Sequence, residues 1–193
     1  MITKLLTDVA DIYAGYLFTK GIQPDPASCY SVLQLKDIQS TGDINIPTLK
    51  VSIQSAPKLK YFLKKDDVLF SAKVRLQAIH VKQYVENIIV SSHFFLIRPK
   101  TKLVDSRYLS WFLNQPPAKK FLAKHTEGTS VLGVKLKNLS ELPVIIMPEE
   151  KRNALLALDE LRYQHQILTK KLDNKVNQLI NSISSQFFGV QEK

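Results

Sequence analysis

Hydrophobic and polar positions divide the chain into two parts with different periods. Up to about residue 147, apolar residues occur in short runs rich in β-branched and aromatic side chains, which are typical of strands. The runs that predict strands are residues 30–35, 68–71, 79–81, 88–90, 94–97 and 144–146. From residue 149 to about residue 186 there is no Pro and no Gly, and apolar positions recur every three or four residues, which predicts one long helix.

Two short helices are expected between the last strands. Asp105 is a suitable N-cap for a helix ending at residue 113, whose apolar side would carry Tyr108, Leu109, Phe112 and Leu113. The sequence Asn-Gln-Pro-Pro at residues 114–117 ends this helix, because proline disfavours helical backbone before it. Pro117 can then occupy the first turn of a second helix over residues 118–124.

The long helix carries a heptad-like apolar stripe, which predicts association with another helix. Its members are Leu158, Leu161, His165, Leu168, Leu172, Val176, Leu179 and Ile183. The spacing contains one four-residue stutter between Leu168 and Val176, which locally unwinds a supercoil. A helix of this length spans about 57 Å, whereas a body of some 150 residues is only about 30 Å across. We therefore expect a homodimer through this helix, with His165 as a polar seam residue; the alternative is that the stripe packs on its own body.

These patterns predict a mixed α+β protein: a strand-rich domain over residues 1–147, followed by a long coiled-coil helix over residues 148–193. Pro148 suits a helix start, and Glu149 and Glu150 suit the positive end of the helix dipole.

Charge adds a candidate partner. The 193 residues are 45% hydrophobic and 23% charged, which excludes a disordered chain, and the formal net charge is +10. Residues 48–82 and 100–137 each hold eight basic and two acidic residues, whereas residues 148–193 hold seven and six. A basic body beside a nearly neutral helix favours a polyanionic partner such as nucleic acid bound by the body.

The candidate contacts follow from side-chain chemistry. Lysines contact phosphates and supply affinity, and the candidates are Lys58, Lys60, Lys73, Lys119, Lys120, Lys124, Lys135 and Lys137. Guanidinium, amide and hydroxyl groups can read base edges, and the candidates are Arg75, Gln77, Thr129 and Ser130. For each lysine, an ordinary solvated position on the surface is an equally open interpretation.

Catalytic patterns are few. There is no glycine-rich phosphate loop, and the four histidines lack metal-ligand spacing. Residues 114–117 differ from the Asn-Pro-Pro-aromatic loop of adenine methyltransferases by an inserted Gln and a missing aromatic residue, so we interpret them as a helix stop. Asp66 and Asp67 could bind a metal, but a solvated turn before a strand is the favoured interpretation. We expect no enzymatic activity, no cofactor and no metal.

The chain carries no apparent targeting signal. Residues 1–10 lack a long apolar segment of the kind found in signal peptides, and no run of about 18 apolar residues could span a membrane. Cys29 is the single cysteine, so no internal disulfide can form. The cytoplasm is the expected compartment.

The succession of segments resembles one half of the specificity subunit of type I restriction–modification enzymes. Residues 63–71, Leu-Lys-Lys-Asp-Asp-Val-Leu-Phe-Ser, are similar to the family's Gly-Asp-Ile-Leu-Phe-Ser strand, although Lys65 or Asp66 stands where a Gly often precedes the Asp. Further matching segments, in the family's order and ending in a long helix, are residues 6–15, 30–42, 90–99, 108–114, 128–130 and 139–148. The helix start at residues 147–151 departs from the usual Pro-Pro-Leu-x-Glu-Gln.

This resemblance implies a DNA target recognition domain followed by a spacer helix. A full subunit carries two such units with antiparallel spacer helices, whereas this chain carries one. The resemblance also implies double-stranded DNA, methyltransferase (modification) subunits and a restriction translocase as partners, and a subunit that selects the target without being an enzyme.

Two other classes of function stay open from the sequence. One is a nuclease or methyltransferase accessory enzyme. The other is a coiled-coil adaptor whose basic face binds an acidic protein.

Overall fold

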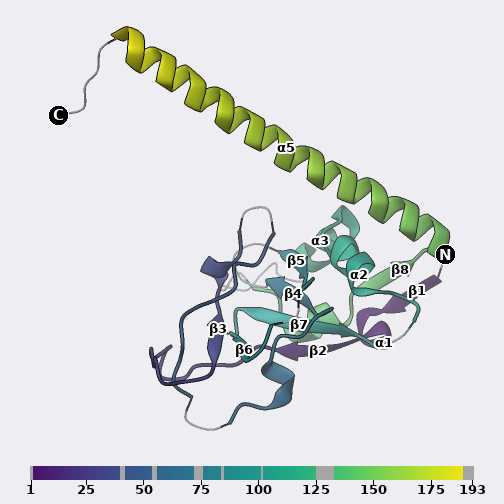
Figure 1. Ribbon diagram of the computed structural model, residues 1–193. Coiled ribbons are helices and arrows are strands. Elements are labelled where there is room, and N and C mark those ends of the chain that lie inside the picture. The colour runs from purple at the N-terminus through teal and green to yellow at the C-terminus, as the bar shows by residue number, and fades with distance from the viewer. Residues whose placement is uncertain are drawn as a thin grey trace. The chain divides into compact units, whose positions relative to one another are not determined.

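The computed structural model describes residues 2–39, 42–53, 56–71, 76–83, 85–100, 102–124 and 133–188. The chain forms two compact units, Met1–Met147 (unit 1) and Pro148–Lys193 (unit 2). Unit 1 mixes strands with short helices, and unit 2 contains one long helix (Figure 1). The predicted α+β class is therefore confirmed.

A four-stranded antiparallel sheet forms the centre of unit 1. Its strand order is β2-β7-β4-β5, with β2 at Ala10–Ala14, β7 at Phe94–Pro99, β4 at Val68–Ser71 and β5 at Gln77–His80. The prediction for β4 is confirmed, and β7 continues two residues further than predicted. Strand β5 starts two residues before the predicted 79–81, because its pairing with β4 includes Ser71↔Gln77.

A parallel pair of strands covers one face of this sheet. It consists of β3 (Ser31–Leu33) and β6 (Ile88–Val90), joined in register from Ser31↔Ile88 to Leu33↔Val90. The buried core cluster combines side chains of this pair with those of β4, β5 and β7, and its members include Leu33, Val90, Leu69, Ile79 and Leu96. The predicted strand over 30–35 ends early, since the side chain of Asp37 accepts a hydrogen bond from Gln34 N (2.8 Å) and the short 3₁₀ helix η1 (Leu35–Asp37) follows.

Helix α2 (Ser106–Leu113) packs against β4 and β5. As predicted, Asp105 is its N-cap: the carboxylate accepts a hydrogen bond from Tyr108 N at 2.7 Å. The four predicted apolar residues of this helix are all buried, and the Tyr108 hydroxyl donates to Ile145 O at 2.5 Å. Helix α3 (Pro116–Lys124) begins two residues earlier than predicted and has Pro117 in its first turn.

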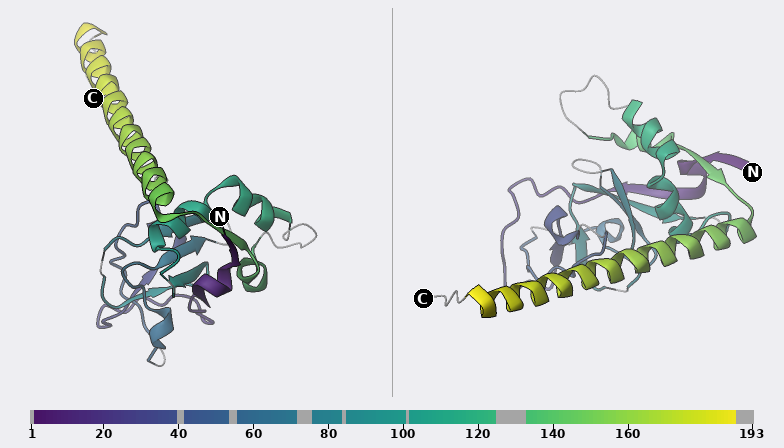
Figure 2. Two further views of the ribbon diagram at one scale, coloured as in Figure 1. Left: turned by 90° about the vertical axis from the view of Figure 1, so that its right-hand side faces the viewer. Right: turned by 90° about the horizontal axis from the view of Figure 1, so that it is seen from above.

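The two ends of unit 1 pair with each other. Strand β1 (Ile2–Leu5) runs antiparallel to β8 (Pro143–Ile146), in register from Ile2↔Ile146 to Leu5↔Pro143 (Figures 1 and 2). The helical turn α1 (Leu6–Val9) links β1 to β2, and α4 (Leu136–Ser140) precedes β8. Strand β8 was predicted, whereas β1, α1, β2 and α4 were not.

Gly15 allows a close approach between two backbone segments of unit 1. Its N donates to Phe94 O at 3.0 Å, and Tyr16 N donates to Val90 O at 2.7 Å, so the chain after β2 lies directly on the β6–β7 connection. A Cβ at Gly15 would lie 2.1 Å from Ser91 O. Only glycine fits at this contact.

Unit 2 is the helix α5 (Glu149–Phe188), which is 40 residues long and begins where predicted. Glu149 and Glu150 lie in its first turn, and Arg152 N donates to Pro148 O at 3.0 Å. At 1.5 Å per residue its length is about 60 Å. Among the described residues, no helix is both long enough and apolar enough to cross a membrane.

Candidate nucleic-acid interface

Helix α3 presents three of the predicted phosphate-binding lysines to solvent. Lys119, Lys120 and Lys124 are exposed, whereas Ala118 and Leu122 are buried on the opposite side of the helix. The amphipathic pattern of the helix therefore separates its anchoring side from a basic side. Such a side can contact consecutive phosphates as a row of point charges.

The lysines around α4 are also exposed. Lys135 directly precedes α4 and Lys137 lies within it, and the Lys137 ammonium is 4.0 Å from the Glu141 carboxylate. An exposed pair at this distance contributes little to stability, so Lys137 remains available to another anion. The predicted residues Lys73, Arg75, Thr129 and Ser130 lie outside the described residues.

Lys58 and Lys60 lie in a different part of unit 1. They flank Leu59 at the short 3₁₀ helix η2 (Leu59–Tyr61), and both are exposed. The Lys60 ammonium lies 5.1 Å from the centroid of the Tyr61 ring, within the range of a cation–π contact. Helix η2 is at the lower end of unit 1 in Figure 1 and α3 is at the upper end, so Lys58 and Lys60 lie apart from the lysines of α3.

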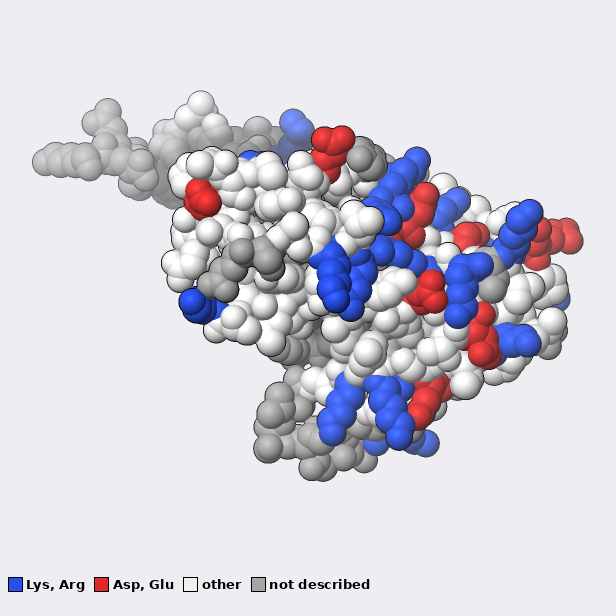
Figure 3. Space-filling model, turned by 90° about the horizontal axis from the view of Figure 1, so that it is seen from below, with Lys and Arg blue, Asp and Glu red and all other residues white. Residues whose placement is uncertain are grey.

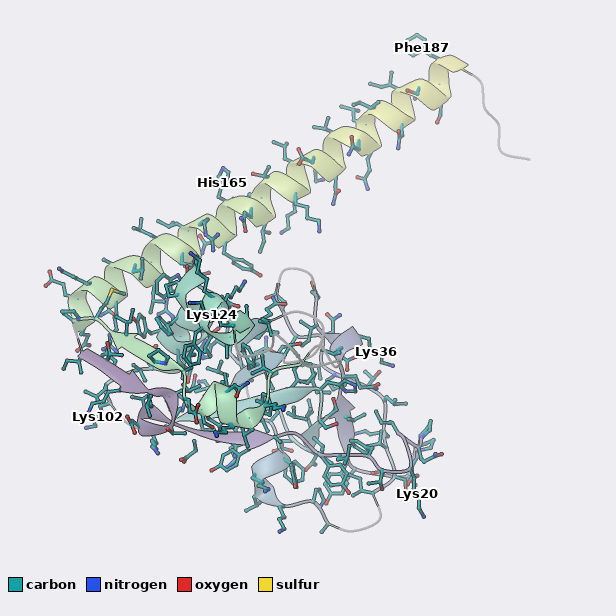
Figure 4. The ribbon with its side chains drawn as sticks, turned by 180° about the vertical axis from the view of Figure 1, so that it is seen from behind. Lys20, Lys36, Lys102, Lys124, His165 and Phe187 are labelled. Atoms are coloured by element: carbon teal, nitrogen blue, oxygen red, sulfur yellow. The ribbon has the colours of Figure 1, made fainter. Side chains whose placement is uncertain are left out.

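The surface charge agrees with this dispersed arrangement. Figure 3 shows basic side chains in several separate groups, with acidic side chains interspersed over part of the face. The view with labelled side chains likewise places Lys20, Lys36, Lys102 and Lys124 at well-separated positions (Figure 4). A net charge of +10 therefore does not mark a single binding surface by itself.

Gln77, the predicted base-reading residue that the structure describes, begins β5 and is half-buried. It adjoins a turn that starts at Gln39: a Cβ added at Gly42 would lie 3.1 Å from Gln77 Nε2. Gly42 itself has φ +89°, a conformation that favours glycine. No local sequence pattern indicates this contact, because Gln77 lies 35 positions after Gly42.

The Asn114 side chain hydrogen-bonds to the backbone of β5 at the edge of the sheet, next to Gln77. Its Oδ1 accepts from Ala78 N at 3.0 Å and its Nδ2 donates to Ala78 O at 2.7 Å. The same Nδ2 also donates to Ser110 O at 3.0 Å. The segment interpreted as a helix stop therefore has a second role, since its first side chain takes the place of a neighbouring strand.

The two aspartates before β4 differ in their surroundings. Asp66 is exposed and its Oδ1 lies 3.0 Å from His80 Nε2, as expected for a solvated turn. Asp67 is buried, accepts from Arg98 Nε at 2.8 Å and Nη2 at 3.1 Å, and accepts from Lys64 N at 2.8 Å. The interpretation as a solvated turn is wrong for Asp67, because this carboxylate is a structural partner of Arg98.

These groups line a cleft of about 610 Å³ that also contains Asp105, Ser106 and Arg107. Among the residues that the structure describes, no group of three or more His, Cys, Asp or Glu side chains could hold a metal ion.

Helix α5 exposes its apolar stripe along most of its length. Leu158, Leu161, Leu168 and Leu172 are 61–65% exposed, and Val176, Leu179 and Ile183 are 44–61% exposed. His165 is also exposed and is labelled in Figure 4. Ile180 and Phe187 lie outside the predicted stripe; they are 53% and 81% exposed and extend the apolar surface toward the end of the helix.

Comparison with known proteins identifies the family of this chain. A family model for the type I restriction modification DNA specificity domain matches residues 3–185. The chain belongs to this family. The specificity-domain match covers both the strand-rich unit and nearly all of α5, so the resemblance seen in the sequence is confirmed. A search of curated proteins found no match.

Solved structures of specificity subunits share the fold of this specificity domain. The S subunit of a type I restriction-modification system from M. genitalium aligns with 99% of this chain at a TM-score of 0.59 and 13% identity. The HsdS subunit from Thermoanaerobacter tengcongensis aligns with 96% at a TM-score of 0.67 and 18% identity. A chain from a study of complex assembly and conformational transition of the type I R-M system aligns with 93%, at a TM-score of 0.61 and 17% identity.

This chain spans about half the length of each of those proteins. The aligned region covers 46%, 43% and 47% of the three chains.

Proposed function

We propose that this chain recognises a specific sequence in double-stranded DNA on behalf of a type I restriction–modification system. The match of a DNA specificity domain over residues 3–185 is the observation that carries this proposal. Methylation and cleavage would be carried out by methyltransferase and restriction subunits, and this chain would supply target selection. Unit 1 would serve as the recognition domain and α5 as the spacer, as residues 1–147 and 148–193 were predicted to do.

The exposed lysines of α3 and α4 are the phosphate contacts that we favour. The group comprises Lys119, Lys120, Lys124, Lys135 and Lys137, and all of them are exposed. Lys73, Arg75, Thr129 and Ser130 stay candidates from the sequence. Lys58 and Lys60 lie at the other end of unit 1, so binding of one short duplex at α3 would leave them free.

Salt dependence tests the lysine contacts. Removing a lysine–phosphate contact is expected to reduce the slope of log K against log salt by about 0.9 for each copy of the chain that touches the DNA, and to weaken binding equally for all sequences. Lys124→Ala should show both effects. Lys20→Ala is the matched control, since Lys20 is an exposed lysine far from Lys124 (Figure 4). A parent protein that shows no preference over random duplex in competition would refute the proposed function.

We further infer that two copies associate through α5. An apolar stripe with side chains 44–65% exposed is costly to leave in water, and a second copy can cover it by two-fold symmetry. Two copies would place two recognition units on one DNA and would favour an interrupted palindrome.

Sedimentation velocity tests the dimer. The parent chain should sediment as a dimer at micromolar concentration, and Leu172→Glu should shift it to a monomer while the helical circular dichroism signal persists. Leu103→Glu is the matched control, because Leu103 is an exposed leucine of unit 1 that lies outside the stripe. A monomeric parent chain would refute the inference.

A further inference from the structure

The turn beside Gln77 belongs to a small hairpin that carries amide side chains. Residues 37–39 and 42–45 lie antiparallel to each other: Asn45 N donates to Asp37 O at 2.8 Å, Gln39 N donates to Asp43 O at 2.9 Å, and Ile38 pairs with Ile44 in an antiparallel bridge. We call these two runs of residues the amide hairpin. The hydrogen bonds between the two runs hold their side chains on a defined support.

Two amide side chains are already organised on the amide hairpin. Gln39 Nε2 donates to Asn45 Oδ1 at 2.6 Å, and both residues are exposed. This bond uses one acceptor site of the Asn45 carboxamide, which has a second lone pair on Oδ1 and two donors on Nδ2. A carboxamide in this state can still make the paired donor and acceptor contacts by which Asn or Gln recognises adenine N6 and N7.

The third amide belongs to Gln77 at the start of β5. The 3.1 Å distance between a Cβ built at Gly42 and Gln77 Nε2 shows that the tip of the hairpin lies against this side chain. The backbone of β5 is fixed immediately after it, since Asn114 bonds both polar backbone groups of Ala78. Gln77 is thus confined between a glycine turn and an anchored strand.

The amide hairpin differs in charge from the surface that carries the proposed phosphate-binding lysines. The amide hairpin holds Asp37 and Asp43 and no lysine or arginine among its described residues. Acidic side chains disfavour close contact with phosphates, whereas uncharged amides suit base edges. The amide hairpin and α3 both lie along the upper end of unit 1 in Figure 1. At this end, α3 can contact phosphates while the amide hairpin contacts base edges.

We propose that the amide hairpin, together with Gln77, reads A·T base pairs in the major groove, with Asn45 and Gln77 each reading one adenine, and that Gly42 positions Gln77 for its contact. This inference rests on the proposed function, because it names the residues that would select the sequence. Asn45 and Gln77 are the reading residues. Gly42 is a positioning residue, because a Cβ there would press on the Gln77 amide and shift it.

Selection from a random duplex pool, followed by sequencing, tests the inference on the chain with its methyltransferase subunit present. Gln77→Ala and Asn45→Ala should each lose about tenfold of the preference for adenine at one position, with the salt slope unchanged. Gly42→Ala should relax the same position as Gln77→Ala. Gly21→Ala is the matched control, because Gly21 also has a positive φ (+76°) but a Cβ there would meet nothing within 4 Å.

A second readout uses the chemistry of adenine itself. Replacing the adenine at the affected position by 7-deazaadenine removes the N7 acceptor, and should weaken the parent protein about tenfold but leave Gln77→Ala unaffected. The inference fails if Gln77→Ala and Gly42→Ala alter different positions or none, or if Gly21→Ala has the effect of Gly42→Ala. A parent complex that selects no sequence would overturn the proposed function and this inference together.

Discussion

Asn114 should be among the most important polar side chains for the stability of unit 1. The side chain makes three hydrogen bonds, two to the backbone of Ala78 and one to Ser110 O, at 2.7–3.0 Å. Ala78 is 4% exposed, so water cannot freely replace these bonds. Three hydrogen bonds at about 0.5–1.5 kcal/mol each give about 1.5–4.5 kcal/mol for Asn114→Ala, and the stranded Ala78 N–H moves the expected cost to the upper half of that range.

The neighbouring residue supplies the control. Gln115 is on the same helix end and makes one side-chain hydrogen bond, from Nε2 to Trp111 O at 3.0 Å. Gln115→Ala should therefore cost about 1 kcal/mol or less. Urea unfolding at one fixed protein concentration measures both free energies of unfolding, and amide hydrogen exchange reports on Ala78 directly. The reasoning is wrong if the two variants are equally stable, or if the Ala78 amide stays protected in Asn114→Ala.

Two further substitutions test buried contacts of unit 1. Asp67→Asn should lower the free energy of unfolding by about 3–5 kcal/mol, because it leaves the Arg98 guanidinium without its counter-charge. Asp66→Asn, at the exposed neighbour, is the control and should cost about 1 kcal/mol or less. Urea unfolding measures both. Gly15→Ala should give an unfolded or insoluble protein by circular dichroism and gel filtration, since its Cβ would lie 2.1 Å from Ser91 O; a folded variant with a parent-like melting temperature would contradict this.

Local patterns were sufficient for the elements whose signals lie within a few residues. The N-cap at Asp105, the break before Pro116 and the 3.6-residue period of α5 are all short-range features, and each appears in the structure where it was expected. Strand β4 was equally readable from its run of buried residues. In these segments local propensity and tertiary packing favour the same conformation.

The missed elements depend on partners that are distant in the sequence. All four residues of β1 are exposed, so it has no buried alternation, and it is a strand because it pairs with β8 some 140 positions later. Strand β2 likewise depends on β7. The burial of Asp67 arises from Arg98, 31 positions away. No window of a few residues contains such information.

The candidate interface was predictable in composition but not in arrangement. The two basic windows were visible in the sequence, and the lysines of the second one gather on α3 and around α4. No local pattern in the sequence indicates that Lys58 and Lys60 of the first window lie at the opposite end of unit 1 from α3, or that Gly42 touches Gln77. Charge counts report which residues are present, whereas a binding face depends on the long-range packing that orients them.

The proposed dimer and the proposed lysine contacts together make a quantitative expectation. In a two-fold symmetric complex, one substitution removes the same contact from both copies, so Lys124→Ala should reduce the salt slope by about 1.8 rather than 0.9. In a monomer produced by Leu172→Glu, the same lysine change should reduce the slope by about 0.9. Measuring both slopes by fluorescence anisotropy over a range of salt concentrations therefore counts how many copies of unit 1 touch the DNA. Equal slope changes in the two backgrounds would mean that a single recognition unit binds each duplex, whatever the oligomeric state of the free chain.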